Sequence, residues 1–279
     1  MNYKIVVDSC GELPGKLKED GRFENVPLEM SVDDYRIVDD ETFDQADFLR
    51  RVAASPNSPK STCPSPEQYM SAFDCEAGHV YAVTLSSQLS GSYNSAEIGR
   101  KLYLEEKGQK QIHVFDSRSA SVGETLIAMK IQECEEAGLA FEEVVEKVEA
   151  FITGMNTSFV LENLETLRKN GRLSNIKAFV AGALNIKPVM AGTAEGTISQ
   201  IGQARGIGKA VDKMIHDLIA KTVNPQEKIF AISHCNCPKR AKEAAEKVRK
   251  LAEFKEIFVI DTAGISSMYA NDGGIIMAV

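Results

Sequence analysis

Short runs of β-branched residues alternate with helical segments through the first half of this chain, and this alternation constrains the fold more than any other feature. The runs span residues 3–7, 79–85 and 111–117. The second and third pass through a polar turn into a segment with helical periodicity. Repeated strand–turn–helix units predict a parallel sheet with helices on both faces. Because ligands bind beyond the carboxyl ends of such strands, we expect the turns at 8–9, 86–92 and 116–121 to share one edge.

The pattern changes after an amphipathic segment at 141–155, which is predicted to be the last helix of the first lobe. Beyond it, "EGTISQIGQAR" alternates like an exposed antiparallel strand, and amphipathic helices are predicted at 208–222 and 239–254. The expected fold class is therefore α/β with two lobes. An N-terminal parallel-sheet α/β domain occupies 1–153, and a C-terminal α+β domain with a mixed or antiparallel sheet occupies 154–279.

A less regular region lies between the first two strand–helix units. Residues 44–55 predict a helix, and the segment before them predicts a short strand and a turn. The stretch "PNSPKSTCPSP" at 56–66 carries four prolines in eleven residues, which predicts an extended, stiff loop. A helix is expected to resume at Glu67.

Charge and hydropathy exclude several classes of protein. The 279 residues carry a formal net charge of −8, which argues against general nucleic-acid binding because that requires a basic surface. No run approaches the roughly 20 apolar residues of a membrane span. The N-terminus enters a strand-like run at once, unlike a signal peptide. We therefore expect a cytoplasmic protein with reduced thiols and at most transient membrane contact.

Six cysteines are scattered along the chain, and only Cys235 and Cys237 lie close together, beside His234. This pair could supply half of a metal site, but no second cluster of cysteine and histidine completes four ligands. The alternative is a loop that follows a buried strand. We expect no metal and no cofactor.

Serines crowd the turn after the second strand, in "TLSSQLSGSYNSAE" at 84–97. Unpaired N–H groups at a helix N-terminus favour phosphate or carboxylate, and Gly91 lets the backbone approach the bound group. Serines before a helix are also the preferred N-caps, which is the alternative interpretation. One cap needs one serine, whereas four stand here, so a ligand-binding role is favoured. The stretch matches neither nucleotide-binding motifs nor the hydrolase elbow.

Two other stretches contain candidate binding residues. Ser61 and Thr62 lie in the proline-stiffened segment, which fixes the directions of their hydroxyls; a plain linker is the alternative. Arg172 follows a glycine in "RKNGRLSN", and its planar guanidinium suits carboxylate or phosphate. The alternative there is a solvated arginine at the start of a helix. No histidine has an evident serine and aspartate partner in the sequence, although such triads assemble in space.

A series of motifs follows in fixed order along the chain: "KIVVDSCGELP", "VPLEM", "KSTCPSPEQY", "TLSSQLSGSYNSA", "VFDSRSASVGETL", "LRKNGRLS", "ALNIKPVM" and "GGIIMAV". In this order they resemble the DegV family of bacterial fatty-acid-binding proteins. The resemblance extends from residue 3 to 279. "LSGSYNSA", "NGRLS" and "NIKP" are its most specific parts.

The resemblance implies two α/β lobes with a ligand tunnel between them, in which one long-chain fatty acid such as palmitate or oleate lies. It implies a carboxylate held by Ser61, where "STCP" stands for the family's "TSQP", and by Ser90 of "LSG", with Thr62 and Gly91 beside them. Arg172 of "NGR" corresponds to an arginine near the head group in members that present the acyl chain to a separate fatty acid kinase. The weakly charged segment at 176–192 could line the tunnel.

The C-terminal motif departs from the family pattern. Many members have "HTGPG", whereas this chain has "YANDG", which places Tyr269 at the histidine position near the head group and Asp272 at the proline position. The leading hypothesis is a monomeric, non-catalytic lipid carrier that binds a long-chain fatty acid and hands it to a fatty acid kinase catalytic subunit. The alternative is an enzyme that acts on an acyl or phosphorylated small molecule through Arg172 and the serine loop.

Overall fold

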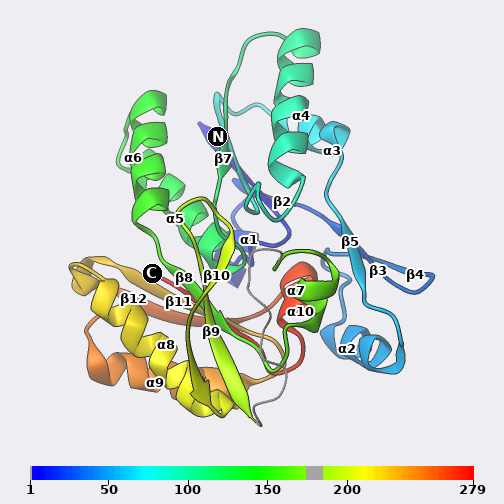
Figure 1. Ribbon diagram of the computed structural model, residues 1–279. Helices are drawn as coiled ribbons and strands as arrows, with labels where there is room; N and C mark the ends of the chain where they lie inside the picture. The colour runs from blue at the N-terminus through cyan, green and yellow to red at the C-terminus, as the bar shows by residue number, and fades with distance from the viewer. Residues whose placement is uncertain (1, 174–184) are drawn as a thin grey trace.

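The computed structural model describes residues 2–173 and 185–279, and Figure 1 shows them as two packed lobes. A parallel four-stranded sheet in the order β2–β1–β6–β7 forms the centre of the N-terminal lobe. Its strands are β1 (Tyr3–Asp8), β2 (Phe23–Val26), β6 (His79–Thr84) and β7 (Gln111–Asp116). The alternation of β-branched runs with helices therefore predicted this sheet correctly.

Helices cover both faces of the N-terminal sheet, as the sequence pattern predicts. On one face lie α3 (Pro66–Phe73) and α4 (Ser92–Lys107). On the other lie α5 (Val122–Glu136), α6 (Phe141–Gly154) and the short α1 (Gly15–Lys18). Successive side chains of a strand point to opposite faces. Val6 accordingly packs with α3 and α4, whereas Ile5 and Val7 pack with α5 and α6.

A small antiparallel sheet, in the order β4–β3–β5, extends from the N-terminal lobe. It consists of β3 (Glu29–Val32), β4 (Tyr35–Val38) and β5 (Lys60–Thr62), with α2 (Gln45–Ala54) following β4. The expectation of an extended, stiff loop at 56–66 was wrong for residues 60–62, because they form a strand in which Ser61 pairs with Met30. The four prolines lie before or after β5, so none removes a hydrogen-bond donor from the strand itself.

The C-terminal lobe contains a mixed six-stranded sheet in the order β10–β9–β8–β13–β11–β12, as predicted. Only β11 and β12 pair in parallel. The strands are β8 (Thr157–Val160), β9 (Ile186–Gly192), β10 (Ile198–Arg205), β11 (Ile229–His234), β12 (Glu256–Asp261) and β13 (Ile275–Ala278). The helical elements are α7 (Glu165–Lys169), α8 (Ile207–Lys221), the 3₁₀ turn η1 (Pro225–Glu227), α9 (Pro238–Leu251) and α10 (Gly264–Ala270).

Helix α5 lies between the two large sheets. It contacts β1 and β6 of the first sheet and β11 and β13 of the second. Ile127 and Ile131 join the core of the N-terminal lobe, while Val122 and Leu126 join a core shared with the C-terminal lobe. A helix covered on both sides must be apolar on more than one face. This explains why every residue from Val122 to Ala128 is buried, including Glu124 and Thr125.

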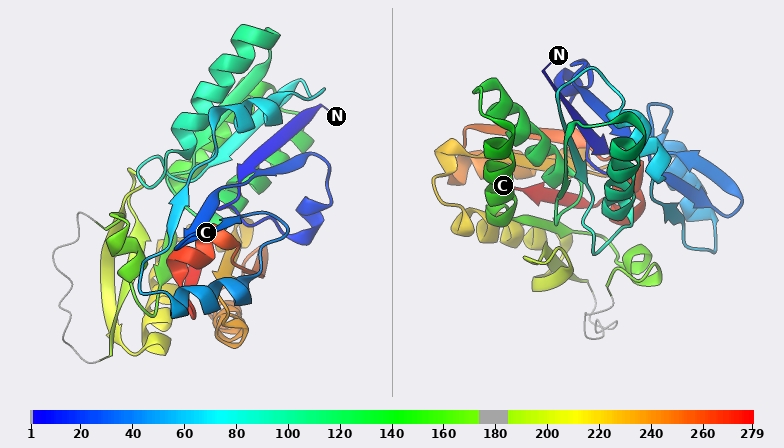
Figure 2. Two further views of the ribbon diagram at one scale, coloured as in Figure 1. Left: turned by 90° about the vertical axis from the view of Figure 1, so that its right-hand side faces the viewer. Right: turned by 90° about the horizontal axis from the view of Figure 1, so that it is seen from above.

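The two lobes meet at a second place, where the small N-terminal sheet and α2 lie against α10. The left view of Figure 2 shows the blue α2 beside the red α10, and the two helices are in contact. The Gln45 amide of α2 donates hydrogen bonds to the Thr262 carbonyl and to the Ser267 hydroxyl, at 3.0 Å each. α6 ends at Gly154 and β8 begins at Thr157, and the boundary placed between 153 and 154 stays a prediction.

Among the helices of the described ranges, none combines the length and the apolar character that a membrane span requires. Residues 176–184 of the weakly charged segment proposed to line the tunnel lie outside the described residues.

Candidate functional site

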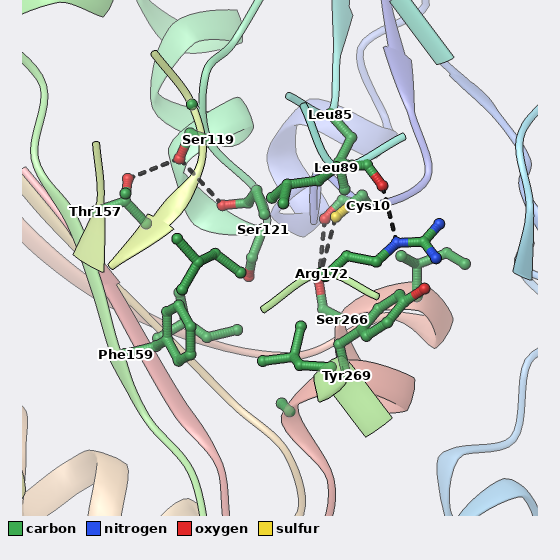
Figure 3. A pocket seen from close by; sticks show the side chains of 18 of the residues that line it. Cys10, Leu85, Leu89, Ser119, Ser121, Thr157, Phe159, Arg172, Ser266 and Tyr269 are labelled. Carbon is green, nitrogen blue, oxygen red and sulfur yellow. Dashed lines mark hydrogen bonds between the residues drawn. The ribbon is translucent and has the colours of Figure 1, made fainter. Parts of the chain in front are cut away.

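A cavity lies where the carboxyl edge of the N-terminal sheet faces the C-terminal lobe (Figure 3). Its empty space measures about 750 Å³, open solvent at the mouth included. Each of the three turns that we predicted to share an edge supplies residues that line the cavity or residues that directly adjoin the lining residues. The residues from the N-terminal lobe that line it are Cys10, Leu85, Leu89 and Arg118 to Ser121. Those from the C-terminal lobe include Phe159, Leu161, Leu167, Arg172, Ile198, Ile265, Tyr269 and Ile276.

The serine loop between β6 and α4 is folded as a tight turn, in which the amides of Leu89 and Ser90 both donate to the Ser86 carbonyl. The Ser86 hydroxyl donates across the lobe boundary to the Gly196 carbonyl at 2.7 Å. The Ser90 hydroxyl lies 3.1 Å from that of Ser92 and accepts the Ser92 amide at 3.2 Å. The N-cap of α4 is Gly91 and not a serine, so the capping interpretation holds only in that the Ser90 hydroxyl, one residue earlier, accepts the first amide of the helix. Through Ser86 the loop also docks the C-terminal lobe.

Arg172 joins the serine loop to the C-terminal lobe. Its Nε donates to the Leu89 carbonyl at 3.1 Å, and Nη1 donates to the Asn170 carbonyl. The guanidinium carbon lies 5.9 Å from the centre of the Tyr269 ring. Within the described residues, no carboxylate forms a salt bridge with Arg172. Arg172 is among the residues that line the cavity, and its three remaining N–H groups stay available to a ligand.

Ser61 contacts Tyr269, a residue of the cavity wall, although 208 positions separate them. The residues that line the cavity do not include Ser61, Thr62, Ser90 or Gly91 themselves. The Ser61 hydroxyl lies 3.0 Å from the Tyr269 hydroxyl. Two hydroxyls carry two hydrogens, and their mutual hydrogen bond uses one, so one hydrogen is left to donate to a ligand. Of the other predicted site residues, Thr62 is exposed beside Ser61, and Gly91 lies against the Cys63 side chain, which directly follows β5.

Sequence reasoning missed the role of the loop between β7 and α5. Ser119 lies 2.7 Å from the Thr157 hydroxyl (Figure 3), and Ser121 lies 2.7 Å from the Ser233 hydroxyl, so both bridge the lobes. Ser121 adopts φ of +58°, a conformation that serine rarely takes. The three serines that follow Asp116 were visible in the sequence, but no local pattern indicated partners in the other lobe.

Two buried carboxylates hold the start of α10, the helix that carries Tyr269. Asp39 accepts the Gly264 and Ile265 amides at 2.6 and 2.8 Å, and burial raises its pKa to about 6. Glu12 accepts the Ser121 hydroxyl at 2.7 Å and the Ala263 amide at 3.3 Å. Burial raises the pKa of Glu12 to about 7. Both acids come from the N-terminal lobe, so they tie one wall of the cavity to the other lobe.

Other chemistry that the sequence left open receives no support from the geometry. His234 lies 3.4 Å from the exposed Asp261, and burial lowers the pKa of its imidazole. Cys235 is buried and Cys237 half-buried, and both are free thiols. In the described ranges, no three side chains of histidine, cysteine, aspartate or glutamate are grouped so that they could hold a metal ion.

Comparison with known proteins finds relatives that match this chain over nearly its whole length. The family model described as "Uncharacterised protein, DegV family" matches residues 2–277. A DegV domain-containing protein of Streptococcus pneumoniae is 35% identical over 280 residues, which cover 99% of this chain and 98% of that protein.

Solved structures extend the comparison to the fold. A DegV-family protein from Ruminococcus gnavus, refined with vaccenic acid, is 55% identical with a TM-score of 0.98, and the match covers 100% of each chain. The Fatty Acid Kinase (Fak) B3 protein of S. pneumoniae, loaded with linoleic acid, is 33% identical with a TM-score of 0.90, covering 100% of this chain and 99% of that one. By its family match, its curated relatives and its fold, this chain belongs to the DegV family.

Proposed function

We propose that this protein binds one long-chain fatty acid in the cavity between its lobes and acts as a non-catalytic carrier. The carboxylate lies at the mouth formed by Ser61, Ser90, Arg172 and Tyr269, with Thr62 and Gly91 beside it. The acyl chain lies along the apolar wall. No cofactor takes part in this function.

The observation that carries the proposal is the distribution of free polar groups in the cavity. Most hydroxyls in its wall are already paired within the protein: Ser119 with Thr157, Ser121 with Glu12, and Ser266 with the Cys10 carbonyl. A paired hydroxyl presents little unmet hydrogen-bonding capacity, so these wall positions suit methylene groups.

Groups that can still donate gather at one end of the cavity. Arg172 uses two of its five N–H groups on carbonyls, and the pair Ser61 and Tyr269 has one hydrogen to spare. A cavity that is apolar along its wall and cationic at its mouth suits an amphiphilic anion. Each buried CH₂ of such a ligand contributes about 0.8 kcal/mol, so a long chain binds tightly with few polar contacts.

The comparisons support the same ligand class. The R. gnavus structure is refined with vaccenic acid, and a DegV-family protein from Eubacterium eligens, 28% identical with a TM-score of 0.89, is loaded with heptadecanoic acid. The similarity to the Fak B3 protein supports a partnership with a fatty acid kinase, which would phosphorylate the carboxylate at the mouth. We further propose that the carrier is monomeric and cytoplasmic, with no nucleic-acid partner and at most transient membrane contact.

Mass spectrometry of lipid extracted from the purified protein tests the proposal. We expect about one fatty acid per chain, and uptake of added palmitate or oleate by protein from which the lipid has been removed. A variant that should block the cavity is Ala270→Phe, because Ala270 lines the cavity beside Tyr269 and the larger side chain would occupy the space of the acyl chain. This variant should keep its circular dichroism spectrum and lose the lipid. Wild-type protein that neither carries nor takes up fatty acid would rule the carrier function out.

A further inference from the structure

Serine and threonine side chains bring hydroxyl groups into the cavity wall, although the proposed ligand is a hydrocarbon chain. The residues that carry them are Ser119, Ser121, Thr157, Thr197 and Ser266. A hydroxyl with a free hydrogen would donate it to an oxygen atom on a ligand. The class of acyl chain that this wall accepts therefore depends on whether its hydroxyl hydrogens are already committed within the protein.

Most of these hydroxyls have neutral partners close by. The Ser119 hydroxyl lies 2.7 Å from that of Thr157, and the Ser266 hydroxyl donates to the Cys10 carbonyl at 3.2 Å (Figure 3). The Thr197 hydroxyl lies 2.9 Å from that of a second threonine in the same hairpin. These pairs are made between uncharged groups of the wall and its immediate neighbours.

Ser121 differs, because its hydroxyl donates to a carboxylate. The acceptor is Oε2 of Glu12, at 2.7 Å, and the Ser233 hydroxyl lies 2.7 Å from the same Ser121 oxygen. A hydroxyl has one hydrogen, so while Ser121 donates to Glu12, Ser233 must donate to Ser121. Both hydrogens of the serine pair are then used. A hydrogen bond to an ionised acceptor is roughly twice as strong as one between neutral groups, so Ser121 is held firmly.

Glu12 is fixed behind the wall by further contacts. It is 4% exposed, its Oε1 accepts the Ala263 amide at 3.3 Å, and its backbone carbonyl accepts the Thr125 hydroxyl at 2.6 Å. Ser121 lines the cavity, whereas Glu12 is not among the lining residues. The carboxylate therefore acts on a ligand only through the hydroxyl that it holds.

We propose that the cavity selects an unsubstituted acyl chain over one that carries a mid-chain hydroxyl group, and that Glu12 is a positioning residue that sets this selectivity by taking the hydrogen of Ser121. A hydroxyl on the chain gives up the hydrogen bonds that it accepts from water when it enters the cavity. It gains no donor from Ser121 in return. This inference rests on the proposed function and adds the class of acyl chain to it.

The size of the effect follows from the cost of leaving a buried polar group unpaired. That cost corresponds to a factor of about 5 to 150 in affinity. We therefore expect the wild-type protein to prefer stearate to stearate that carries one mid-chain hydroxyl by about tenfold or more.

Competition between ligands measures this preference directly. Protein freed of lipid is incubated with an excess of an equimolar mixture of stearate and its 9-, 10- and 12-hydroxy derivatives, and the bound acids are then extracted and quantified by mass spectrometry. The ratio of bound acids gives the ratio of their affinities. Burial raises the pKa of Glu12 to about 7, so a pH of about 8.5 keeps its carboxylate ionised during the experiment.

Glu12→Leu tests the assigned residue, because it removes the carboxylate and keeps a side chain of similar size. Ser121 and Ser233 then need only one of their two hydrogens for their mutual bond, and the other is released. The preference for stearate over at least one hydroxystearate should fall about fivefold or more. The matched control is the double variant Glu12→Leu/Ser121→Ala, which lacks the released hydrogen and should regain the wild-type preference. A cavity that is merely loosened would stay unselective in both variants.

Three results would overturn the proposal. They are equal binding of stearate and the hydroxystearates by the wild type, an unchanged preference in folded Glu12→Leu, and a relaxed preference that persists in the double variant. If Glu12→Leu does not keep the wild-type circular dichroism spectrum, Glu12→Ala and its double variant with Ser121→Ala provide the same comparison, with the same expected results. Failure of the wild type to bind any of the four acids would instead refute the proposed function.

Discussion

Gly196 lies in the β9–β10 hairpin at the point where the C-terminal lobe touches the serine loop. Its φ is +87°, and a Cβ added there would lie 2.3 Å from the Ser86 hydroxyl and 3.0 Å from the Arg118 Cα. The Gly196 carbonyl also accepts the Ser86 hydroxyl at 2.7 Å. Gly196→Ala should therefore strain the backbone and push the hairpin away from the loop at the same time.

The magnitude of the effect follows from these two contributions. A left-handed φ costs an L-residue about 1–2 kcal/mol, and steric overlap in a packed site costs typically 1–3 kcal/mol. We expect Gly196→Ala to lower the free energy of unfolding by about 2–5 kcal/mol. Gly138 provides the matched control, because its φ is +74° and no atom lies within 4 Å of the position of an added Cβ. Gly138→Ala should cost only the backbone contribution, about 1–2 kcal/mol.

Urea unfolding followed by circular dichroism measures the free energy of unfolding of the wild type and both variants. Because the hairpin closes one side of the cavity, Gly196→Ala should also weaken laurate binding severalfold, whereas Gly138→Ala should leave it unchanged. Equal losses of stability in the two variants would refute the reasoning, since they would show that contact with Ser86 and Arg118 costs nothing. Unchanged laurate affinity in Gly196→Ala would show that this contact does not position the cavity wall.

Three further predictions concern the mouth and the buried acids. Replacing Ser61 and Ser90 together by alanine should weaken fatty-acid binding at least tenfold in calorimetry with an unchanged circular dichroism spectrum; an unchanged affinity would move the carboxylate elsewhere. Arg172→Met should weaken laurate binding and reduce its dependence on salt concentration, because a cation beside the carboxylate is lost; an unaltered salt dependence would place the arginine outside the site. Asp39 has its pKa raised to about 6, so the folded state binds more protons than the unfolded state between about pH 4 and 6. The stability of the wild type relative to Asp39→Asn should therefore fall by roughly 1–3 kcal/mol as the pH rises from 4 to 7, measured by urea unfolding, and a constant difference would contradict the raised pKa.

Local patterns in the sequence predicted the elements and several site residues. The alternation of strands and helices predicted the parallel N-terminal sheet, because hydrophobic periodicity depends on residues a few positions apart. The cluster of serines before α4 predicted a loop at the ligand-binding edge for the same reason. The family resemblance, rather than periodicity, singled out Ser61 and Tyr269, which the structure places 3.0 Å apart. That these residues hold a carboxylate is still a prediction.

Tertiary structure alone decided how the lobes are joined. Residues 60–62 form the strand β5 because they pair with β3, about 30 residues earlier in the chain. No pattern within "PNSPKSTCPSP" encodes that partner. Asp39 reaches the start of α10 across 225 positions, and Ser121 reaches Ser233 across 112. The sequence by itself determined which segments are apolar, which segments form turns and which segments carry hydroxyl groups. The packing of the two lobes decides which polar groups are buried together, because only that packing removes them from water. It therefore also decides which of these groups can still donate a hydrogen bond to a ligand.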